Sequence, residues 1–226
     1  MFFDHYDQVR IINLPERVDR RRDMEGAFQR IGASGHRDLA FVPGIRVQSK
    51  EPFNSLGAHG CFLSHLRVLE QALARKASVL VLEDDCAFLP LTDTFTPAAD
   101  VDILYGGWAA SDPDDLVNSD IIGAHCMGFS VAALEKLVPY LHAILDPAET
   151  FDPNVVRSDF DPAVRPPIDG AYVWFRRTYP EFRTQFAMLA KQRSSISDIA
   201  GRRWFDRMPV VRDMADAVRR VRNQIG

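Results

Sequence analysis

The chain has no long apolar run, few cysteines and none of the common glycine-rich phosphate-binding motifs. No stretch approaches the roughly 20 apolar residues of a membrane-spanning helix, so we do not expect an integral membrane protein. The opening residues, MFFDHYDQVR, lack a basic segment followed by a long apolar one, and we therefore expect no export signal. Apolar residues make up 46% of the chain and charged residues 26%, which is typical of a folded globular protein.

The three cysteines, Cys61, Cys86 and Cys126, lie far apart in the sequence and form no CxxC pair. The sequence therefore predicts neither a zinc ribbon nor a disulfide framework. We interpret all three as small buried side chains in a reducing compartment, and the expected localisation is cytoplasmic.

Charge is unevenly distributed along the chain. The net charge is −4, which argues against a nucleic-acid partner, but residues 191–226 hold nine Lys or Arg against four Asp. We predict a catalytic domain over residues 1–190 and a basic extension over residues 191–226 that contains an amphipathic helix from Pro209 to Ile225. Such a helix favours peripheral contact with an anionic surface, such as the inner face of the cytoplasmic membrane. The alternative is that its apolar stripe packs on the domain.

Apolar β-branched runs alternate with segments of helical periodicity. Strands are predicted at 9–14, 39–42, 78–82, 102–105, 125–130 and 185–189, helices at 19–31, 60–76, 131–145 and 169–175, and a long loop at 146–167. This order predicts an α/β fold with a mostly parallel central sheet flanked by helices. Ligands bind beyond the carboxyl ends of the strands in such sheets, so we expect the site to follow Leu14 and Leu82.

Three consecutive acids, Glu83, Asp84 and Asp85, end the strand predicted at 78–82. Their mutual repulsion would be relieved by a divalent cation, and hard oxygen ligands suit Mg²⁺ or Mn²⁺. In an extended chain Glu83 and Asp85 would share one side, which would face the metal and the ligand, while Asp84 would point away. The alternative is an acidic turn or helix cap.

A cluster of arginines follows the first predicted strand. Arg17 and Arg20 are three residues apart and can share one side of the opening helical turn, where bidentate phosphate binding is favoured. The alternative is a solvated face in which these arginines pair with neighbouring Asp residues.

Three further residues carry polar groups that could take part in binding or catalysis. Ser64 and His65 lie on the helix predicted at 60–76, where a histidine is by default a hydrogen-bonded structural residue. Asp169 follows Pro166-Pro167-Ile168 and can be either a helix cap or the general base that meets an acceptor hydroxyl.

Taken together, these motifs resemble glycosyltransferase family 25, which includes bacterial lipopolysaccharide and lipooligosaccharide transferases and the collagen galactosyltransferases. The resemblance covers most of residues 9–175, and Gln192–Ile199 (QRSSISDI) also resembles the C-terminal end of the family. The matching stretches are Ile11–Arg21 (IINLPERVDRR), Gly57–Leu73 (GAHGCFLSHLRVLEQAL), Val79–Cys86 (VLVLEDDC), Gly123–Leu137 (GAHCMGFSVAALEKL) and Pro166–Tyr172 (PPIDGAY).

The resemblance implies a GT-A-like fold, a nucleotide-sugar donor, a divalent metal and inversion at the anomeric carbon. Residue by residue, it implies donor contacts at Asn13, Arg17, Arg20, Ser64, His65, Glu83 and Asp84, metal ligands at Glu83, Asp85 and His125, and catalytic roles for Asp85 and Asp169. His125 can instead be a core residue, and the first acid of the family's DxD motif is Glu here.

The expected function is transfer of a sugar, of the galactose type, from a UDP-sugar to a saccharide acceptor of lipopolysaccharide, lipooligosaccharide or another cell-surface glycan. An alternative is a nucleotide-sugar-binding protein of the same fold that lacks catalysis. A nucleotidyltransferase is disfavoured because the sequence has no glycine-rich, lysine-bearing phosphate loop near the first strand.

Overall fold

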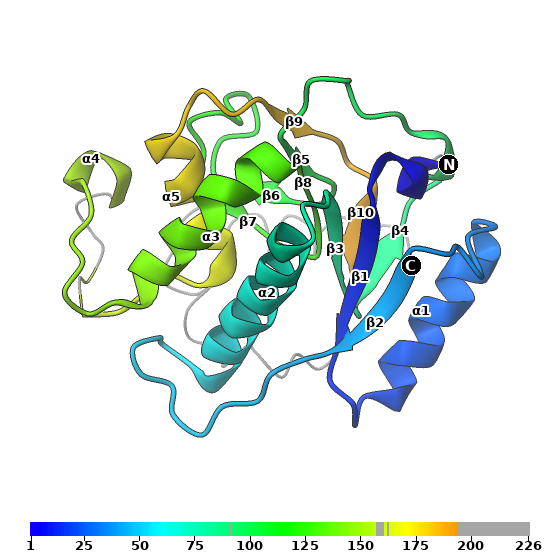
Figure 1. The fold of residues 1–226 in the computed structure, drawn as a ribbon, viewed down its shortest axis with the longest axis horizontal. Helices are drawn as coiled ribbons and strands as arrows, with labels where there is room; N and C mark the ends of the chain where they lie inside the picture. The colour runs from blue at the N-terminus through cyan, green and yellow to red at the C-terminus, as the bar shows by residue number, and fades with distance from the viewer. Residues whose placement is uncertain (91, 157–160, 162, 194–226) are drawn as a thin grey trace, which may run out of the picture.

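The computed structural model describes residues 1–90, 92–156, 161 and 163–193. Within them, six strands form one sheet in the order β2-β1-β3-β8-β5-β9 (Figure 1). Their bounds are Gln8–Asn13 (β1), Leu39–Pro43 (β2), Val79–Glu83 (β3), Ile103–Tyr105 (β5), Cys126–Phe129 (β8) and Thr184–Phe186 (β9).

The strands whose ends are expected to carry the site run parallel to one another. β1 pairs in parallel with β2 and β3, so Ile11 lies between Phe41 and Leu82. β8 runs antiparallel to both of its neighbours, β3 and β5, and β5 pairs in parallel with β9. The expected α/β class with a mostly parallel sheet is confirmed, and β1, β2 and β3 end at the same edge.

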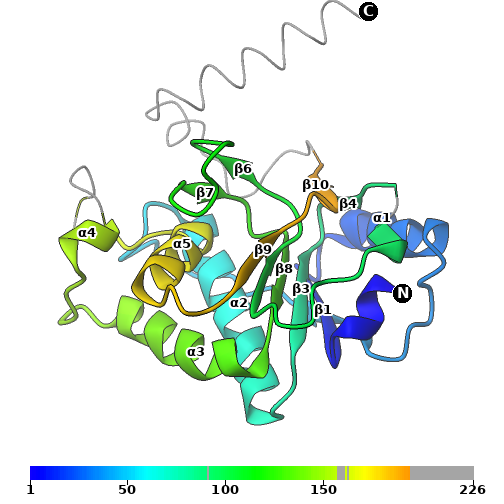
Figure 2. The same ribbon diagram turned by 90° about the horizontal axis from the view of Figure 1, so that it is seen from above.

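Helices cover both faces of the sheet. α1 (Val18–Arg30) lies on one side, and α2 (Leu56–Ala74), α3 (Val131–Leu145) and α5 (Ile168–Thr178) lie on the other (Figure 2). The alternation of side chains along β3 explains this arrangement. Val79 and Val81 join the core beneath α2, α3 and α5, whereas Leu80 and Leu82 join the core beneath α1. All four side chains are fully buried, and each contributes about 1.5–3 kcal/mol by leaving water.

Three boundaries differ from those expected. α2 begins at Leu56 rather than Gly60, because the hydroxyl of Ser55 caps it by accepting from the backbone N–H of Ala58 at 3.1 Å. The strand expected at 185–189 is shorter, since β9 ends at Phe186, and a further strand, β10 (Ala190–Gln192), was not predicted. The loop expected at 146–167 contains the short helix α4 (Pro153–Val156).

Smaller elements complete the described chain. β4 (Cys86–Phe88) pairs antiparallel with β10, and β6 (Ala109–Ala110) pairs with β7 (Ile121–Ile122); the 3₁₀ helices are η1 (Phe2–His5) and η2 (Thr92–Thr94). No helix in the described residues is long and apolar enough to cross a membrane. The helix expected from Pro209 to Ile225 lies outside the described residues, so the division of the chain at residue 190 stays a prediction.

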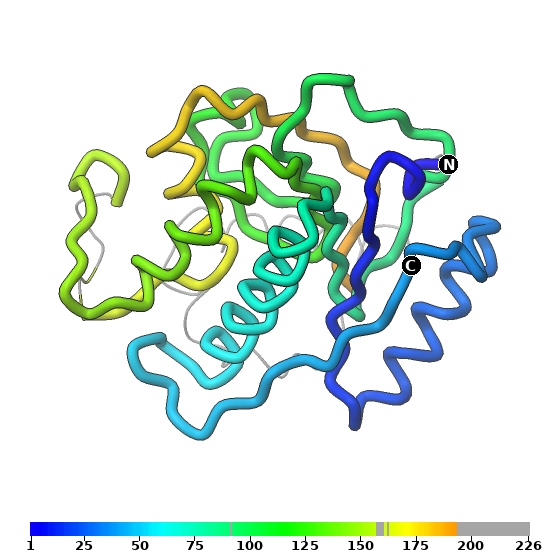
Figure 3. The backbone as a smooth tube through the Cα atoms, in the orientation of Figure 1, coloured from blue at the N-terminus to red at the C-terminus, as the bar shows by residue number. Residues whose placement is uncertain are grey.

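The connection between β2 and α2 shapes the edge where the parallel strands end. Figure 3 follows it from the end of β2, along that edge, to the first turn of α2. The backbone N–H of Gly44 donates to the carbonyl of Asn13 at 2.8 Å, which ties the start of the connection to the end of β1. The connection therefore forms a wall beside the strand ends.

Candidate functional site

A pocket of about 250 Å³ lies at the carboxyl ends of β1, β2 and β3, where the strand pattern predicts a ligand site. One part of its lining is apolar or small, and the other is acidic with two arginines. The lining residues are Ile12, Leu14, Arg20, Gly44, Ile45, Arg46, Val47, Leu56, Gly57, Gly60, Cys61, Ser64, Glu83, Asp84 and Asp85.

The three acids form the sharpest feature of this lining. Glu83 is the last residue of β3, whereas Asp84 and Asp85 form a turn that leads into β4. The expected alternation, with Asp84 facing away, is therefore wrong: all three acids line the pocket. The reason is that the chain turns after Glu83 instead of continuing as an extended strand.

Asp84 is held from two directions. Its side chain accepts hydrogen bonds from the amide of Asn13, at 2.8 Å, and from the guanidinium of Arg20, at 2.7 Å. The Asn13 amide also donates to the carbonyl of Arg17 at 3.2 Å, so it links the end of β1, the start of α1 and the acidic turn. Asn13 and Arg20 thus fix the turn from which the pocket acids project.

Of the three acids, Asp85 has a buried carboxylate oxygen that lacks a hydrogen-bond partner among the described residues. Its other oxygen lies 3.2 Å from the donating amide of Gln192 and 3.6 Å from the guanidinium of Arg20. Burial and the negative charge of Glu83 raise the pKa of Asp85 to about 7, against the opposing effects of Gln192 and Arg20.

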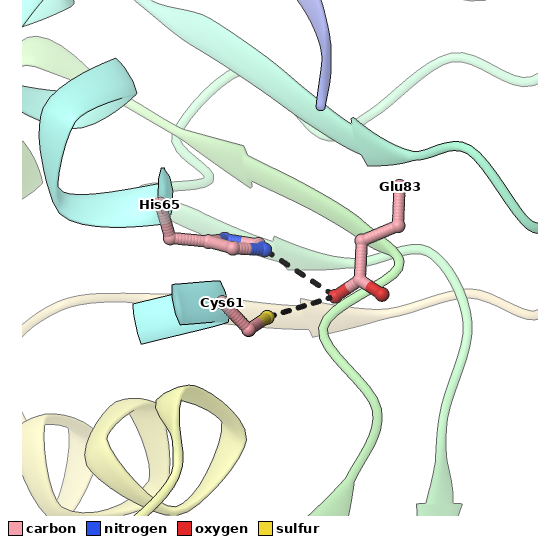
Figure 4. Close-up of side chains that lie close together, drawn as sticks. All are labelled: Cys61, His65 and Glu83. Atoms are coloured by element: carbon pink, nitrogen blue, oxygen red, sulfur yellow. Dashed lines mark hydrogen bonds and ion pairs between the residues drawn. The ribbon is translucent and has the colours of Figure 1, made fainter. Parts of the chain in front are cut away.

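The side chain of Glu83 points toward Cys61 and His65 of α2 (Figure 4). Its carboxylate lies 3.3 Å from Nε2 of His65 and 3.8 Å from the donating thiol of Cys61. Burial alone would raise the pKa of Glu83, but the hydrogen bond from His65 and the positive potential of His65 and His125 outweigh it and leave the pKa below its usual value. The expected hydrogen-bonded role of His65 is therefore confirmed, with Glu83 as its partner.

Ser64 anchors the wall of the pocket. Its hydroxyl accepts from the backbone N–H of Ile45 at 2.7 Å and donates to the carbonyl of Gly60 at 2.6 Å. The absence of a side chain at Gly60 lets the connection between β2 and α2 lie close against α2, because a Cβ there would lie 2.4 Å from the carbonyl oxygen of Ile45. Ser64 thus positions the connection between β2 and α2.

Five predicted site residues are absent from this lining: Asn13 and His65, whose contacts are given above, and Arg17, His125 and Asp169. Arg17 precedes the first turn of α1 and pairs with exposed Asp19 at 2.9 Å, so Arg17 and Arg20 face different partners. Asp169 lies in the first turn of α5 and accepts from the backbone N–H of Gly123 at 3.1 Å. Burial raises the pKa of Asp169. His125 is buried and has Nε2 at 3.4 Å from the carbonyl of Ala190.

The acidic side chains suit a hard divalent cation. The unsatisfied buried oxygen of Asp85 is a ready ligand, and the raised pKa of Asp85 reports the same electrostatic conflict that a cation would remove. The predicted ligands Glu83, Asp85 and His125 are not gathered within 4.8 Å of one another in the described chain. The donors that are gathered this closely are those of Cys61, His65 and Glu83.

Sequence reasoning missed the position of Cys61. It was expected to be a buried apolar side chain like Cys86 and Cys126, which are indeed buried, but it is half-buried and lines the pocket. The signal was its spacing of four residues from His65, which places both side chains on one face of α2. Gln192 was also missed, because its partner Asp85 is 107 residues away in the sequence.

Comparison with known proteins gives two curated relatives. A "Glycosyltransferase 25 family member" of Drosophila pseudoobscura pseudoobscura is 30% identical over 102 residues, covering 37% of this chain and 16% of that protein. One of Drosophila melanogaster is 28% identical over 127 residues, covering 45% and 21%. This chain spans about a fifth or less of their length. The resemblance to glycosyltransferase family 25 is confirmed, although no family model matches the chain.

A solved structure supports the fold over a larger part of the chain. It is described as a glycosyltransferase involved in the glycosylation of the major capsid of PBCV-1, and it is 10% identical with a TM-score of 0.50. The match covers 84% of this chain and 94% of that one. The expected GT-A-like arrangement of the α/β fold is thereby confirmed.

Proposed function

We propose that this protein is a glycosyltransferase that moves a sugar from a nucleoside-diphosphate sugar to a saccharide acceptor. The observation that carries the proposal is the pocket at the ends of β1, β2 and β3, where an acidic turn meets an apolar wall. A nucleotide sugar would fit both parts, because its base suits the apolar wall and a divalent cation held by the acids would join its diphosphate to the acidic turn. The similarity to family 25 glycosyltransferases supports the same activity.

Glu83 and Asp85 are the residues proposed to hold a Mg²⁺ or Mn²⁺ ion, and His125 stays a predicted further ligand. Bound there, the ion would supply electrostatic stabilisation of the charge that develops on the leaving diphosphate. Arg20 lies against Asp84 and Asp85 and adds positive charge on the same side of the pocket. Asn13 holds Asp84 and keeps the turn in place.

Asp169 is proposed as the general base. It would take the proton of an acceptor hydroxyl while that oxygen bonds to the anomeric carbon and the bond from this carbon to the diphosphate oxygen breaks. Attack on the face opposite the leaving group would invert the anomeric configuration. The raised pKa of Asp169 supports the proposal, because a carboxylate with a raised pKa is a stronger base.

The finer proposals are a UDP-sugar donor of the galactose type and an acceptor in lipopolysaccharide, lipooligosaccharide or another cell-surface glycan. They rest on the resemblance to family 25. A thermal-shift series of nucleotide sugars, each with and without Mn²⁺, tests the donor, because a ligand that binds the native state raises Tm by mass action.

The Asp85→Asn variant tests catalysis directly. We expect it to keep the fold and to lose metal-dependent transfer, measured as release of nucleoside diphosphate in the presence of acceptor. Near-normal turnover in this variant would remove Asp85 from the proposed metal site. A wild-type protein that binds a nucleotide sugar but releases no nucleoside diphosphate would instead be a binding protein of the same fold.

A further inference from the structure

Cys61, His65 and Glu83 bring three different metal-binding groups together (Figure 4), and Cys61 and Glu83 also line the pocket. Cys61 and His65 lie one turn apart on the same face of α2, and Glu83 ends the neighbouring strand β3. Their thiol sulfur, imidazole nitrogen and carboxylate oxygen all lie within 4.8 Å of one another. Asp84 and Asp85 are not members of this group and lie instead against Arg20.

Two of the three distances between these donors are close to the edges of a tetrahedron around zinc, and the third is at most 4.8 Å. Zinc lies about 2.0–2.3 Å from nitrogen, oxygen and thiolate ligands, so tetrahedral ligand atoms are separated by about 3.3–3.7 Å. The Nε2 atom of His65 is 3.3 Å from Oε1 of Glu83, and Sγ of Cys61 is 3.8 Å from the same oxygen. Only a small adjustment of these side chains would bring all three to a common ion.

We propose that Cys61, His65 and Glu83 form a binding site for a thiophilic divalent cation of the zinc class, with the fourth position open to the pocket. Thiolate and imidazole ligands favour such ions over Mg²⁺ or Ca²⁺. The Cys61 thiolate and the Glu83 carboxylate together carry two negative charges, which a divalent ion neutralises. Binding releases the thiol proton of Cys61 to solvent and engages His65 through Nε2.

Tyr172 completes the site behind the ligands. Its hydroxyl lies 3.0 Å from Nδ1 of His65, and both side chains are buried. Without a metal, Nε2–H of His65 donates to Glu83 and Nδ1 accepts from this hydroxyl. With the ion on Nε2, the ring would carry its proton on Nδ1 and donate it to the same hydroxyl. Zinc-binding histidines characteristically have such a partner on the second ring nitrogen. The fourth position is accessible because Cys61 and Glu83 line the pocket.

The site would regulate the proposed transfer, a consequence that rests on the proposed function. Glu83 belongs both to this group and to the proposed ligands of the donor metal. A zinc-class ion bound with Cys61 and His65 would withdraw Glu83 from that role and narrow the pocket. Binding itself does not depend on transfer, so it is tested without any assay of activity.

Cobalt is the probe for the first test, because a Co²⁺–thiolate bond produces a strong near-ultraviolet charge-transfer absorption. We expect this absorption when the wild-type protein is titrated with Co²⁺, its loss in Cys61→Ser and its retention in the matched variant Asp85→Asn. Circular dichroism reports whether each variant is folded. No absorption in the wild type, survival of the absorption in Cys61→Ser, or its loss in a folded Asp85→Asn would each overturn the proposal.

Two further measurements do not depend on Cys61→Ser folding. Zn²⁺ is expected to protect Cys61 of the wild-type protein from alkylation, with the modified peptide identified by mass spectrometry. Equal modification with and without Zn²⁺ would contradict the site. The Tyr172→Phe variant should bind Zn²⁺ about 10- to 100-fold more weakly in competition with a chelator, and unchanged affinity would contradict the orientation assigned to His65.

Discussion

At the scale of single residues, Arg20 balances the charge of the pocket. Its side chain is 13% exposed and lies 2.7 Å from Asp84 and 3.6 Å from Asp85, whose side chains are each 8% exposed. A buried carboxylate without a counter-charge is costly. Arg20 therefore lets two acids stay together in the pocket before any cation binds.

Replacing Arg20 with Met should leave both acids uncompensated. We expect the free energy of unfolding to fall by about 3–5 kcal/mol, a decrease of about 6–20 °C in Tm for a domain of this size. Mn²⁺ should raise the Tm of Arg20→Met more than that of the wild type, because the ion would replace the missing charge. Thermal unfolding with and without Mn²⁺ measures both effects.

The matched control is Arg21→Met on the next position of α1. Arg21 pairs with Glu25 on the exposed surface at 3.0 Å and lies over the ring of Phe41. Its loss should cost less than about 1.5 kcal/mol, and Mn²⁺ should not compensate for it. If the two variants lose equal free energy of unfolding, the ion pair of Arg20 with Asp84 contributes no more than an exposed surface pair.

At the same scale, Asp169 should make stability depend on pH. Burial raises its pKa in the folded state, so its stabilising contribution is fully present below the unfolded pKa, near 3.8, and is lost as the pH rises through the folded pKa. Asp169→Asn removes this titration. The wild type should therefore exceed the variant in free energy of unfolding most clearly near pH 4, and by progressively less as the pH rises.

Urea unfolding of both proteins at a series of pH values gives this difference directly. The comparison isolates Asp169, because all other titrating groups are common to the two chains. A difference that stays constant, or widens with rising pH, would contradict the raised pKa. The same variant should lose transfer by about 10²- to 10⁴-fold if Asp169 is the general base, with donor affinity close to that of the wild type.

At the scale of secondary structure, the sequence predicted most elements that form the sheet and the helices around it. The position of β3 could be predicted because its apolar run, which contains β-branched valines, ends at three consecutive acids. The start of α2 was harder to find, since the capping Ser55 precedes a glycine-containing turn without apolar periodicity. β10 was missed because it is only three residues long, has the sequence Ala-Lys-Gln and is defined by its pairing with the distant β4.

The candidate site was predictable where the motif itself carries charge, at Glu83, Asp85 and Arg20. Contacts between distant segments were not predictable. The turn at Asp84 depends on Asn13, 71 residues earlier, and the orientation of His65 depends on Tyr172, 107 residues later. Spacing within one segment cannot reveal which residues of other segments will pack against it.

Gly60 offers a test of how α2 supports the pocket wall. In Gly60→Ala the new methyl group would lie 2.4 Å from the carbonyl oxygen of Ile45, so the wall has to shift. We expect a loss of about 1–3 kcal/mol in the free energy of unfolding and weaker binding of a nucleotide sugar. Urea unfolding and a binding titration measure the two effects.

The same substitution in α1 is the control. A methyl group on Gly26 would meet only the flexible end of the Arg30 side chain, at 3.5 Å. Gly26→Ala should therefore stabilise the protein by about 0.5–1 kcal/mol, because alanine favours a helix over glycine. If both alanine variants change stability in the same direction, the close approach at Gly60 does not support the wall.

At the scale of the whole molecule, the sheet separates two apolar cores and brings the polar chemistry to one edge. The cores lie on opposite faces and share the alternating residues of β3. The pocket acids extend from the end of that same strand. Strand β3 thus stabilises the domain through its buried side chains and presents the proposed catalytic residues at its carboxyl end.

The uneven distribution of charge along the chain predicts that its basic C-terminal segment binds an anionic surface. Residues 191–226 carry nine basic and four acidic side chains, whereas the chain as a whole has a net charge of −4. If the basic segment contacts anionic lipid, the full chain should sediment with vesicles of anionic lipid and a chain shortened at Gly201 should not. Electrostatic binding also weakens as salt shortens the Debye length, from about 10 Å at 0.1 M to about 3 Å at 1 M. Equal sedimentation of the two chains, or sedimentation with neutral vesicles, would show that the basic segment has no lipid-binding role.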